Sequence, residues 1–265
     1  MPPRSHQRSP KIRPLKTSWE FVSDWYADYL SKPGTLQREV IFPGVIRLLD
    51  LKRDDHVLDL ACGEGAFAAL LAQKTGAHVT GLDAAPSLIA RAKQRSSLLL
   101  RFLEGDATRF ADLFPPQSFN GMSCILALQN IETISPIFAD AARVLKPNAP
   151  FVIVINHPCF RQPRQSGWGW DETRALQYRR IDRYLSAYEM PILAHPGSRP
   201  HLKTFSYHRS FQTYVTELAH QGFMIDALEE WISTKVSSSG PRAKAENVAR
   251  AEIPLFLAIR ARKTF

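Results

Sequence analysis

The sequence contains few cysteines and no long apolar segment. Its three cysteines, Cys62, Cys124 and Cys159, are odd in number and widely spaced, so they match neither a disulfide framework nor a zinc cluster. The longest apolar runs, such as 151–155 and 253–259, fall well short of the roughly 20 residues that span a bilayer. No hydrophobic signal-peptide core follows Met1. These absences predict a cytoplasmic protein with no membrane partner.

Acidic side chains are missing from residues 1–16, which hold five Lys or Arg residues and four prolines. This segment therefore contributes five charges to the formal net charge of +9. Proline disfavours helix and unopposed charge disfavours compaction. We expect a disordered, solvated basic tail over 1–16, with a nucleic-acid-binding arm or an organelle-targeting sequence as alternatives.

The rest of the composition is that of an ordinary globular protein. Of the 265 residues, 45% are hydrophobic and 22% are charged, which excludes a coiled coil, a collagen-like chain or a wholly disordered chain. We expect one domain over 17–265 that begins with a helical segment, 17–52. Within it, Trp19, Val22, Tyr26 and Tyr29 recur at helical spacing, and a second helix is expected over 36–51.

Strand and helix patterns then alternate along the chain. Expected strands cover 56–60, 78–82, 98–103, 119–126 and 151–155, and the helices between them end near 74, 95 and 145. Such alternation predicts an α/β fold with a parallel sheet and helices on both faces. A further helix at 211–221 and strands at 223–228 and 253–260 complete the domain.

Two segments interrupt this rhythm. Residues 156–210 lack a clear strand–helix unit, and we expect them to form a cap insertion whose main helix covers 171–185. Residues 233–251 form a long polar connection. The insertion follows directly on the fifth strand, at the edge of the sheet where open α/β folds bind ligands.

The turn after the first strand indicates a nucleotide-like ligand. Gly63 and Gly65 let a ligand approach the backbone, and a helix N-terminus follows. The looser pattern G-x-G-x-x-A, with Asp83 about 20 residues on, also fits a dinucleotide enzyme. Asp59 favours a different ligand, because a carboxylate inside a buried strand is costly without a cationic partner.

The motifs in this region resemble those of the class I S-adenosylmethionine-dependent methyltransferases. The first motif is Asp59-Leu60-Ala61-Cys62-Gly63-Glu64-Gly65. In the same order come Gly81-Leu82-Asp83, Gly105-Asp106-Ala107, Phe119-Asn120-Gly121-Met122 and Val144-Leu145-Lys146-Pro147-Asn148. Asn120 and Asn148 depart from the Asp and Gly that are usual there. The wider chain is similar to bacterial proteins labelled type 11 methyltransferases.

This resemblance implies a fold, a cofactor and a set of site residues. The fold is a Rossmann-like, seven-stranded, mostly parallel sheet whose last strand is antiparallel. The cofactor is S-adenosyl-L-methionine, with S-adenosyl-L-homocysteine as product and no metal. The implied cofactor-binding residues are Asp59, Ala61, Gly63, Gly65, Asp83, Ala84, Asp106, Ala107 and Leu126. Asp83 would bind the ribose, Asp106 the adenine, and the Leu126 carbonyl would lie near the methionine amino group.

The methyl acceptor is predicted from the insertion. Aromatic and Arg side chains between 157 and 186 suit a planar, anionic or phenolic small molecule, although a solvated cap helix packed on the core would have the same composition. Candidate acceptor-binding residues are Tyr26, Gln129, Trp168, Trp170, Tyr178 and Tyr184. His157 follows the fifth strand and is the candidate general base, with His195 and His208 as weaker alternatives.

The sequence therefore predicts a cytoplasmic methyltransferase that acts on a small aromatic or carboxylated metabolite, by O- or N-methylation. Four alternatives remain open: an RNA methyltransferase, a quinone-type C-methyltransferase, a nucleotide-linked oxidoreductase and a catalytically silent cofactor-binding protein. Residues 127–130 resemble the corresponding segment of quinone C-methyltransferases. Nucleic acid is not the expected partner, and the sequence leaves monomer and dimer open.

Overall fold

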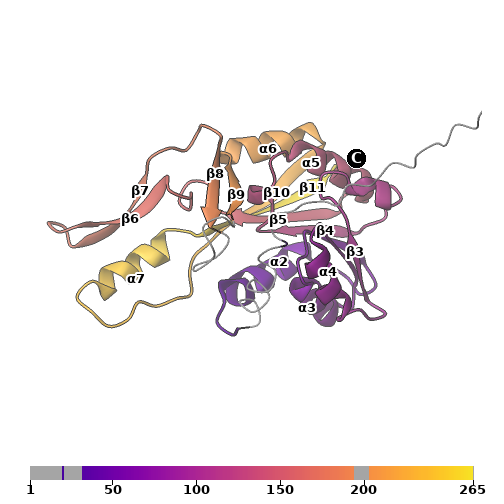
Figure 1. The fold of residues 1–265 in the computed structure, drawn as a ribbon, viewed down its shortest axis with the longest axis horizontal. Coiled ribbons are helices and arrows are strands. Elements are labelled where there is room, and N and C mark those ends of the chain that lie inside the picture. The colour runs from indigo at the N-terminus through magenta and orange to yellow at the C-terminus, as the bar shows by residue number, and fades with distance from the viewer. Residues whose placement is uncertain (1–19, 21–31, 194–202, 265) are drawn as a thin grey trace, which may run out of the picture.

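A seven-stranded sheet forms the centre of the computed structural model, which describes residues 20, 32–193 and 203–264 (Figure 1). The strand order is β10-β11-β5-β4-β1-β2-β3. β11 runs antiparallel to both β10 and β5, and the pairs among β1 to β5 are parallel. The expected mostly parallel sheet with an antiparallel last strand is thus confirmed. The strands are β1 (His56–Leu60), β2 (His78–Asp83), β3 (Leu100–Glu104), β4 (Gly121–Ile125), β5 (Pro150–Asn156), β10 (Phe223–Trp231) and β11 (Phe256–Lys263).

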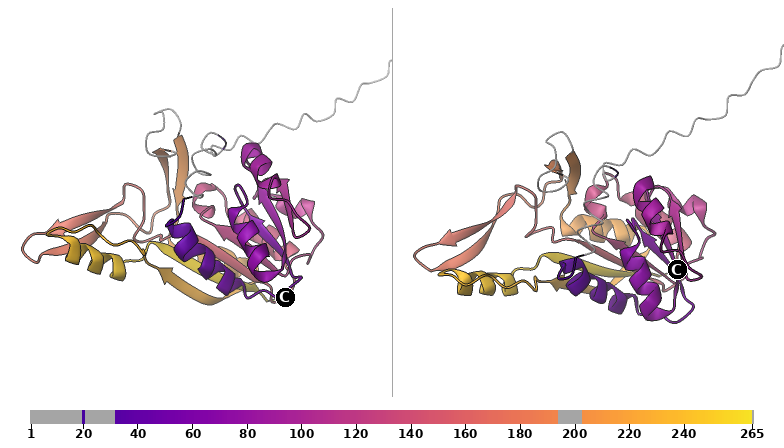
Figure 2. Two further views of the ribbon diagram at one scale, coloured as in Figure 1. Left: turned by 90° about the horizontal axis from the view of Figure 1, so that it is seen from below. Right: turned by 60° about the horizontal axis from the view of Figure 1, so that its bottom comes forward.

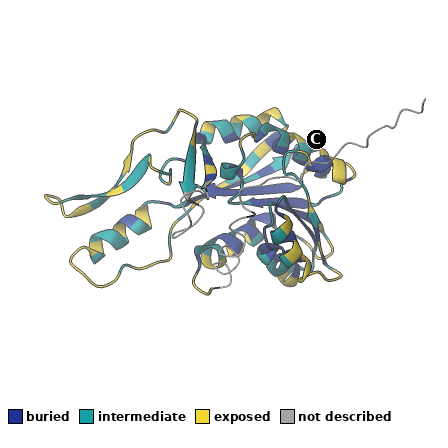
Figure 3. Ribbon diagram, viewed as in Figure 1, coloured by how far each residue is buried: buried dark blue, intermediate teal, exposed yellow. Residues whose placement is uncertain are grey.

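Helices cover both faces of this sheet. One face carries η2 (Gln37–Ile41), α2 (Phe42–Leu49), α3 (Ala66–Thr75) and α4 (Pro86–Lys93), and the other carries η3 (Phe110–Leu113), α5 (Ser135–Val144) and α6 (Phe211–His220) (Figure 1). β5 shows why the strands are apolar on both sides. Phe151, Ile153 and Ile155 pack into the core under α5 and α6, whereas Val152 and Val154 pack under α2. Because both faces of β5 are covered, this strand is a continuous apolar run, and Figure 3 shows the central strands buried, whereas β10 at the edge alternates between half-buried and exposed residues.

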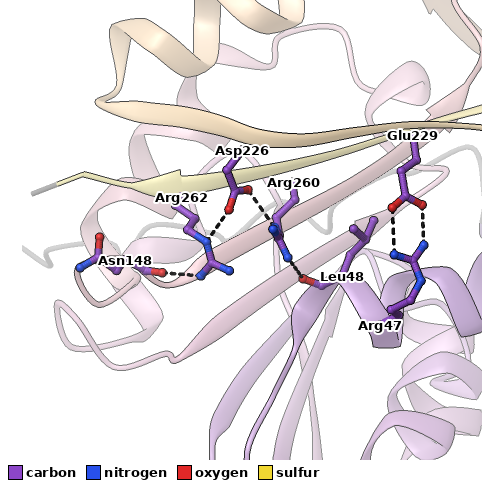
Figure 4. A network of polar contacts seen from close by, with 7 residues as sticks. All are labelled: Arg47, Leu48, Asn148, Asp226, Glu229, Arg260 and Arg262. Atoms are coloured by element: carbon purple, nitrogen blue, oxygen red, sulfur yellow. Dashed lines mark hydrogen bonds and ion pairs between the residues drawn. The ribbon is translucent and has the colours of Figure 1, made fainter.

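Polar contacts attach α2 to the antiparallel edge of the sheet (Figure 4). Arg47 of α2 donates to Glu229 of β10 at 2.9 Å, and Arg260 of β11 donates to the carbonyl of Leu48 at 3.2 Å. Asp226 accepts from both Arg260 and Arg262, and these two guanidinium groups lower the pKa of its carboxyl group. These contacts fix the position of β10 and β11 relative to α2.

Gly44 provides a test of this packing. The indole of Trp231 lies directly against its Cα, where a Cβ would overlap the ring. Gly44→Ala should improve helix propensity and yet destabilise the fold by about 1–3 kcal/mol, because the core is overpacked. Thermal unfolding measures this effect. Gly167→Ala is the control, since its Cβ would meet nothing within 4 Å; an equal melting temperature for both variants would contradict the prediction.

In its described residues, the insertion after β5 contains two hairpins and no helix. β6 (Ser166–Asp171) pairs with β7 (Leu176–Ile181), and β8 (Tyr188–Leu193) pairs with β9 (Lys203–His208). The helix expected over 171–185 is therefore wrong. Tyr178, Ile181 and Leu185, which would share one face of such a helix, are exposed. The physical reason is a turn at 171–175, where the Asp171 side chain accepts from the Arg174 amide and Ala175 has a positive φ.

A second correction concerns residues 233–251, which the sequence predicts as a polar connection. Their second half forms most of the helix α7 (Ala243–Glu252). α7 lies along the β6–β7 hairpin and, with it, forms an arm that projects from the sheet (Figures 1 and 2). Arg242 joins the two parts: it donates to Glu172 at 2.9 Å, and its guanidinium carbon lies 4.6 Å from the Trp170 ring centroid. Sequence pattern missed α7 because only Ala249 in it is buried.

Several expected features lie outside the described residues. They are the basic tail 1–16, Trp19, Tyr26, Val22, Tyr29 and His195. In the part of the chain that the structure describes, every helix is too short or too polar to cross a membrane.

Candidate functional site

A cavity of about 190 Å³ opens at the carboxyl ends of β1, β2 and β4. This position is the usual ligand site of open α/β sheets. Residues from the turns after these strands, after β3, and from η2 and α2 form its walls. The lining residues are Gln37, Phe42, Asp59, Ala61, Cys62, Gly63, Ala66, Phe67, Leu82, Asp83, Ala84, Leu88, Gly105, Asp106, Ala107, Ile125, Leu126, Ala127, Asn130 and Ile131.

Asp83 holds the glycine turn in place. One carboxylate oxygen accepts from the Gly63 amide at 2.9 Å, and the other accepts from the Ala85 amide at 2.9 Å. Ala61 and Gly63 both have φ of 56°, a conformation that costs Ala energy and therefore persists only where its surroundings enforce it. Burial raises the pKa of Asp83, and the backbone amides oppose that rise. Because a carboxylate oxygen has more than one acceptor site, each oxygen retains the capacity to bind a ligand hydroxyl.

Asp59 is the most unusual group at the cavity. It is 2% exposed, and the Ser123 hydroxyl donates to its Oδ1 at 2.8 Å. Its Oδ2 is buried without a hydrogen-bond partner among the described residues. Burial is the main cause that raises the pKa of Asp59 to about 7, and the nearby Asp83 contributes in the same direction. A buried acceptor with no donor is costly, so this oxygen fits a cationic donor of a ligand.

The turn after β3 brings a third acid to the cavity. Asp106 Oδ1 accepts from the backbone amide and the hydroxyl of Thr108, both at 2.8 Å. The Gly105 amide donates to the carbonyl of Asp83 at 2.9 Å. The ends of β2 and β3 are thereby joined, and Asp83 and Asp106 are presented to the same cavity.

The loop after β4 forms the opposite wall. Leu126 has a φ of 53°, and its carbonyl accepts from Gln129 Nε2 at 2.7 Å and from Asn130 Nδ2 at 3.2 Å. The Gln129 Oε1 atom is buried without a partner among the described residues. Leu126 lines the cavity as expected. The resemblance assigns its carbonyl to a ligand, but two side chains of the same loop already donate to that carbonyl.

Eight of the nine expected cofactor-binding residues line this one cavity. The exception is Gly65, which has a φ of 76° and whose missing side chain leaves room for the Phe102 ring. Sequence reasoning missed Gln37, Phe42, Asn130 and Ile131. Phe42 lies in the helical segment before the motifs, with its ring centroid 5.2 Å from that of Phe67, and no motif identifies such a contact.

The expected acceptor-binding residues are not brought to the described cavity. Trp168, Trp170 and Tyr178 lie on the arm, where Trp168 stacks with Arg179 and Tyr178 covers Gly169. Tyr184 accepts from the Phe211 amide at 3.1 Å, which anchors the start of α6. Gln129 supports the Leu126 carbonyl, and Tyr26 lies outside the described residues.

His157 is also engaged by the protein itself. Its Nδ1 accepts from the amides of Cys159 and Phe160, and its Nε2 lies 2.8 Å from Glu230 Oε1. Burial lowers the pKa of His157, an effect that Glu230 partly offsets. The ring is thus a neutral Nε2–H tautomer that donates to Glu230 and has no free nitrogen to accept a proton. Among the described residues, no cluster of His, Cys, Asp or Glu fits a metal ion.

The comparisons agree with this geometry. A family model described as a methyltransferase domain matches residues 57–148. The crystal structure of an S-adenosylmethionine-dependent methyltransferase from Mesorhizobium loti is 26% identical, with a TM-score of 0.66, and the alignment covers 83% of this chain and 96% of that one. Fold and site therefore define a class I methyltransferase domain whose cofactor is S-adenosylmethionine. The matched residues, 57–148, include the three acids of the cavity.

Curated relatives are similar over part of their length. The demethylmenaquinone methyltransferase of Tropheryma whipplei is 33% identical over 117 residues, which are 42% of this chain and 46% of that protein. The 2-phytyl-1,4-naphtoquinone methyltransferase of Synechococcus elongatus is 32% identical over 155 residues, 52% of this chain and 66% of that protein. The chain thus spans about half to two thirds of the length of these relatives.

Proposed function

We propose that this protein transfers the methyl group of S-adenosylmethionine to a small aromatic acceptor. One observation carries the cofactor half of this proposal: the buried Oδ2 of Asp59 lies at the edge of the cavity and has no donor in the part of the chain that the structure describes. The ammonium group of the methionine moiety is a cationic donor of the kind that this oxygen needs. A nicotinamide dinucleotide supplies no cation at that place, so the oxidoreductase alternative leaves the carboxylate unpaired.

Three acidic residues of the cavity would each bind a different part of the cofactor. Asp59 would hold the amino group, Asp83 the ribose hydroxyls and Asp106 the adenine. The bound cofactor supplies an activated methyl group on a sulfonium centre. The protein then has to hold the acceptor in line with that methyl group and exclude water.

The cavity favours a neutral or phenolic aromatic acceptor over a carboxylated one. Its described lining contains three carboxylates, and no Lys, Arg or His. A carboxylate acceptor would meet these like charges and find no Lys, Arg or His in the described lining to pair with, only the sulfonium centre of the cofactor. Phe42, Ile125 and Ile131 instead provide apolar walls, which suit a planar ring.

Quinone-type C-methylation is the second candidate. The relatives named above act on quinone precursors according to their names. The described lining also contains no histidine, because His157 is bonded at both nitrogens and lies outside the cavity. An electron-rich ring carbon can attack the methyl group first and lose its proton to water afterwards, and a phenolate has already lost its proton, so neither acceptor needs a strong base in the protein.

We further propose that segments 17–52 and 156–210 complete the acceptor side of the site within a single domain, 17–265. Gln37 and Phe42 of the first segment already line the cavity. Arg209, within the second, contacts the loop that contains Asn130 and Ile131.

Calorimetric titration tests the cofactor. S-adenosylmethionine and S-adenosylhomocysteine should bind, and NADH should not. Incubation of the loaded enzyme with naphthohydroquinones, phenols and aromatic carboxylates, followed by mass spectrometry, then tests the acceptor. We expect a product 14 mass units heavier from the first or second group. Binding of NADH alone would overturn the proposed reaction, and methylation of the carboxylates alone would overturn the acceptor class.

Cofactor binding should depend on pH through Asp59. Because the pKa of Asp59 is about 7 in the free protein, the fraction with an ionised carboxylate rises about tenfold from pH 6 to pH 8. Affinity for S-adenosylhomocysteine should rise by a similar factor, with release of nearly one proton on binding at pH 6. Titration in buffers of different ionisation enthalpy measures both quantities. A flat affinity across this range would show that Asp59 does not hold the amino group.

A further inference from the structure

The loop that follows β4 is held by a guanidinium group from outside the methyltransferase motifs. Arg209 comes directly after β9, at the end of the insertion, and is 9% exposed. It donates from Nη2 to the carbonyl of Ile131 at 2.8 Å and to the carbonyl of Glu132, and from Nη1 to the carbonyl of Leu128 at 3.4 Å. Three carbonyls within five residues of one loop thus converge on a single cation.

Such a contact has large consequences for the loop. Burying a cation is costly unless its donors are satisfied, and here backbone carbonyls satisfy them. Without the guanidinium, the carbonyls of Ile131 and Glu132 would lose this donor, and the carbonyl of Leu128 would keep the Ile131 amide at 3.3 Å. β9 would still pack against η4 (Leu128–Asn130). The loop would then have to rearrange so that its carbonyls could accept hydrogen bonds from water.

The same loop forms one wall of the cofactor cavity. Leu126, Ala127, Asn130 and Ile131 line it, and the backbone of Leu126 is left-handed. The side-chain amide groups of Gln129 and Asn130 donate to the Leu126 carbonyl and fix it from within the loop. Arg209 fixes the other end of the same segment, so the wall is held at both ends.

We propose that Arg209 is a positioning residue that sets the conformation of 126–132 for binding of the cofactor and acceptor. It touches neither ligand. It acts through the backbone carbonyls of the loop and thereby makes the cofactor site depend on the insertion. The effect on ligand affinity rests on the proposed function, whereas the effect on the loop does not.

Hydrogen–deuterium exchange of peptides that cover 126–132 tests the proposal in the full chain. Arg209→Met should speed exchange there at least tenfold, because the carbonyls lose their cation, and should weaken S-adenosylhomocysteine binding at least tenfold. Arg209→Lys should recover part of both effects, since an ammonium group can bond one or two of the carbonyls. Arg180→Met is the matched control, because Arg180 pairs with Asp182 on the exposed arm, and it should change neither readout.

The outcomes separate this proposal from the proposed function. If the wild-type protein binds no S-adenosylhomocysteine, the proposed function fails, and the exchange of 126–132 still decides whether Arg209 holds the loop. If folded Arg209→Met retains wild-type exchange and affinity, the positioning role is wrong. If Arg209→Met does not fold, Arg209→Lys decides: wild-type exchange in 126–132 would overturn the role, and faster exchange confined to that segment would support it.

Discussion

Asp83→Ala is expected to reduce the affinity for S-adenosylmethionine by at least 100-fold. The Asp83 carboxylate accepts from the amides of Gly63 and Ala85, so it both shapes the glycine turn and faces the ribose side of the proposed ligand. Hydrogen bonds to charged groups contribute about 1.5–3 kcal/mol each. Loss of two such hydrogen bonds therefore lowers the affinity by two or more factors of ten.

Isothermal titration with S-adenosylmethionine and S-adenosylhomocysteine measures this loss. Asp112→Ala is the matched control, because it removes a carboxylate that is 70% exposed and paired with Arg143 outside the cavity. Its affinity should stay within about twofold of the wild type, since exposed ion pairs contribute little. If Asp83→Ala binds with wild-type affinity, Asp83 does not bind the ligand, and its proposed role in accepting hydrogen bonds from the ribose is wrong.

Asp59→Asn is expected to stabilise the free protein and to weaken cofactor binding, two effects of opposite sign. Asparagine keeps the volume of Asp59 and can still accept from Ser123, but it removes a carboxylate whose burial is uncompensated. The same change removes the anionic partner of the proposed ammonium group. We expect at least a tenfold loss of affinity for S-adenosylhomocysteine at pH 8, together with an unchanged or higher melting temperature.

The gain in stability should depend on pH. Since the pKa of Asp59 rises from 3.8 to about 7 on folding, the folded state binds a proton that the unfolded state lacks between about pH 4 and pH 7. Wild-type stability therefore falls as pH rises through that window and levels off above it. Asp59→Asn lacks this slope, so its advantage should grow from pH 4 to pH 7. Urea unfolding at several pH values measures it, with Asp112→Asn as control; a constant difference would contradict the raised pKa.

The sheet could be predicted from the sequence because its strands are buried on both faces. β5 contains five consecutive apolar residues, and β1 carries a single acid, so pattern alone located both strands. The cavity residues were predictable for a related reason. Motif residues at the carboxyl ends of parallel strands must meet at one edge of the sheet, whatever the loops do.

The arm could not be predicted because little of it is buried. Tyr178 and Ile181 flank Arg179 and Arg180 at a spacing of three residues, which also suits one face of a helix, and no core imposes the period of a strand. The decisive contacts are local, such as the Asp171–Arg174 turn and the packing of Tyr178 on Gly169. The role of His157 was equally hidden, since its partner Glu230 lies 73 positions away.

Both parts of the arm leave the sheet from neighbouring positions. Phe256 at the start of β11 pairs with Asn156 at the end of β5 and with Trp231 at the end of β10. The chain thus leaves the sheet at Asn156 and at Trp231 and enters β11 at Phe256, all in one row of paired residues. The arm contributes no residue to the described lining of the cavity, so the length of the arm can change without moving that lining.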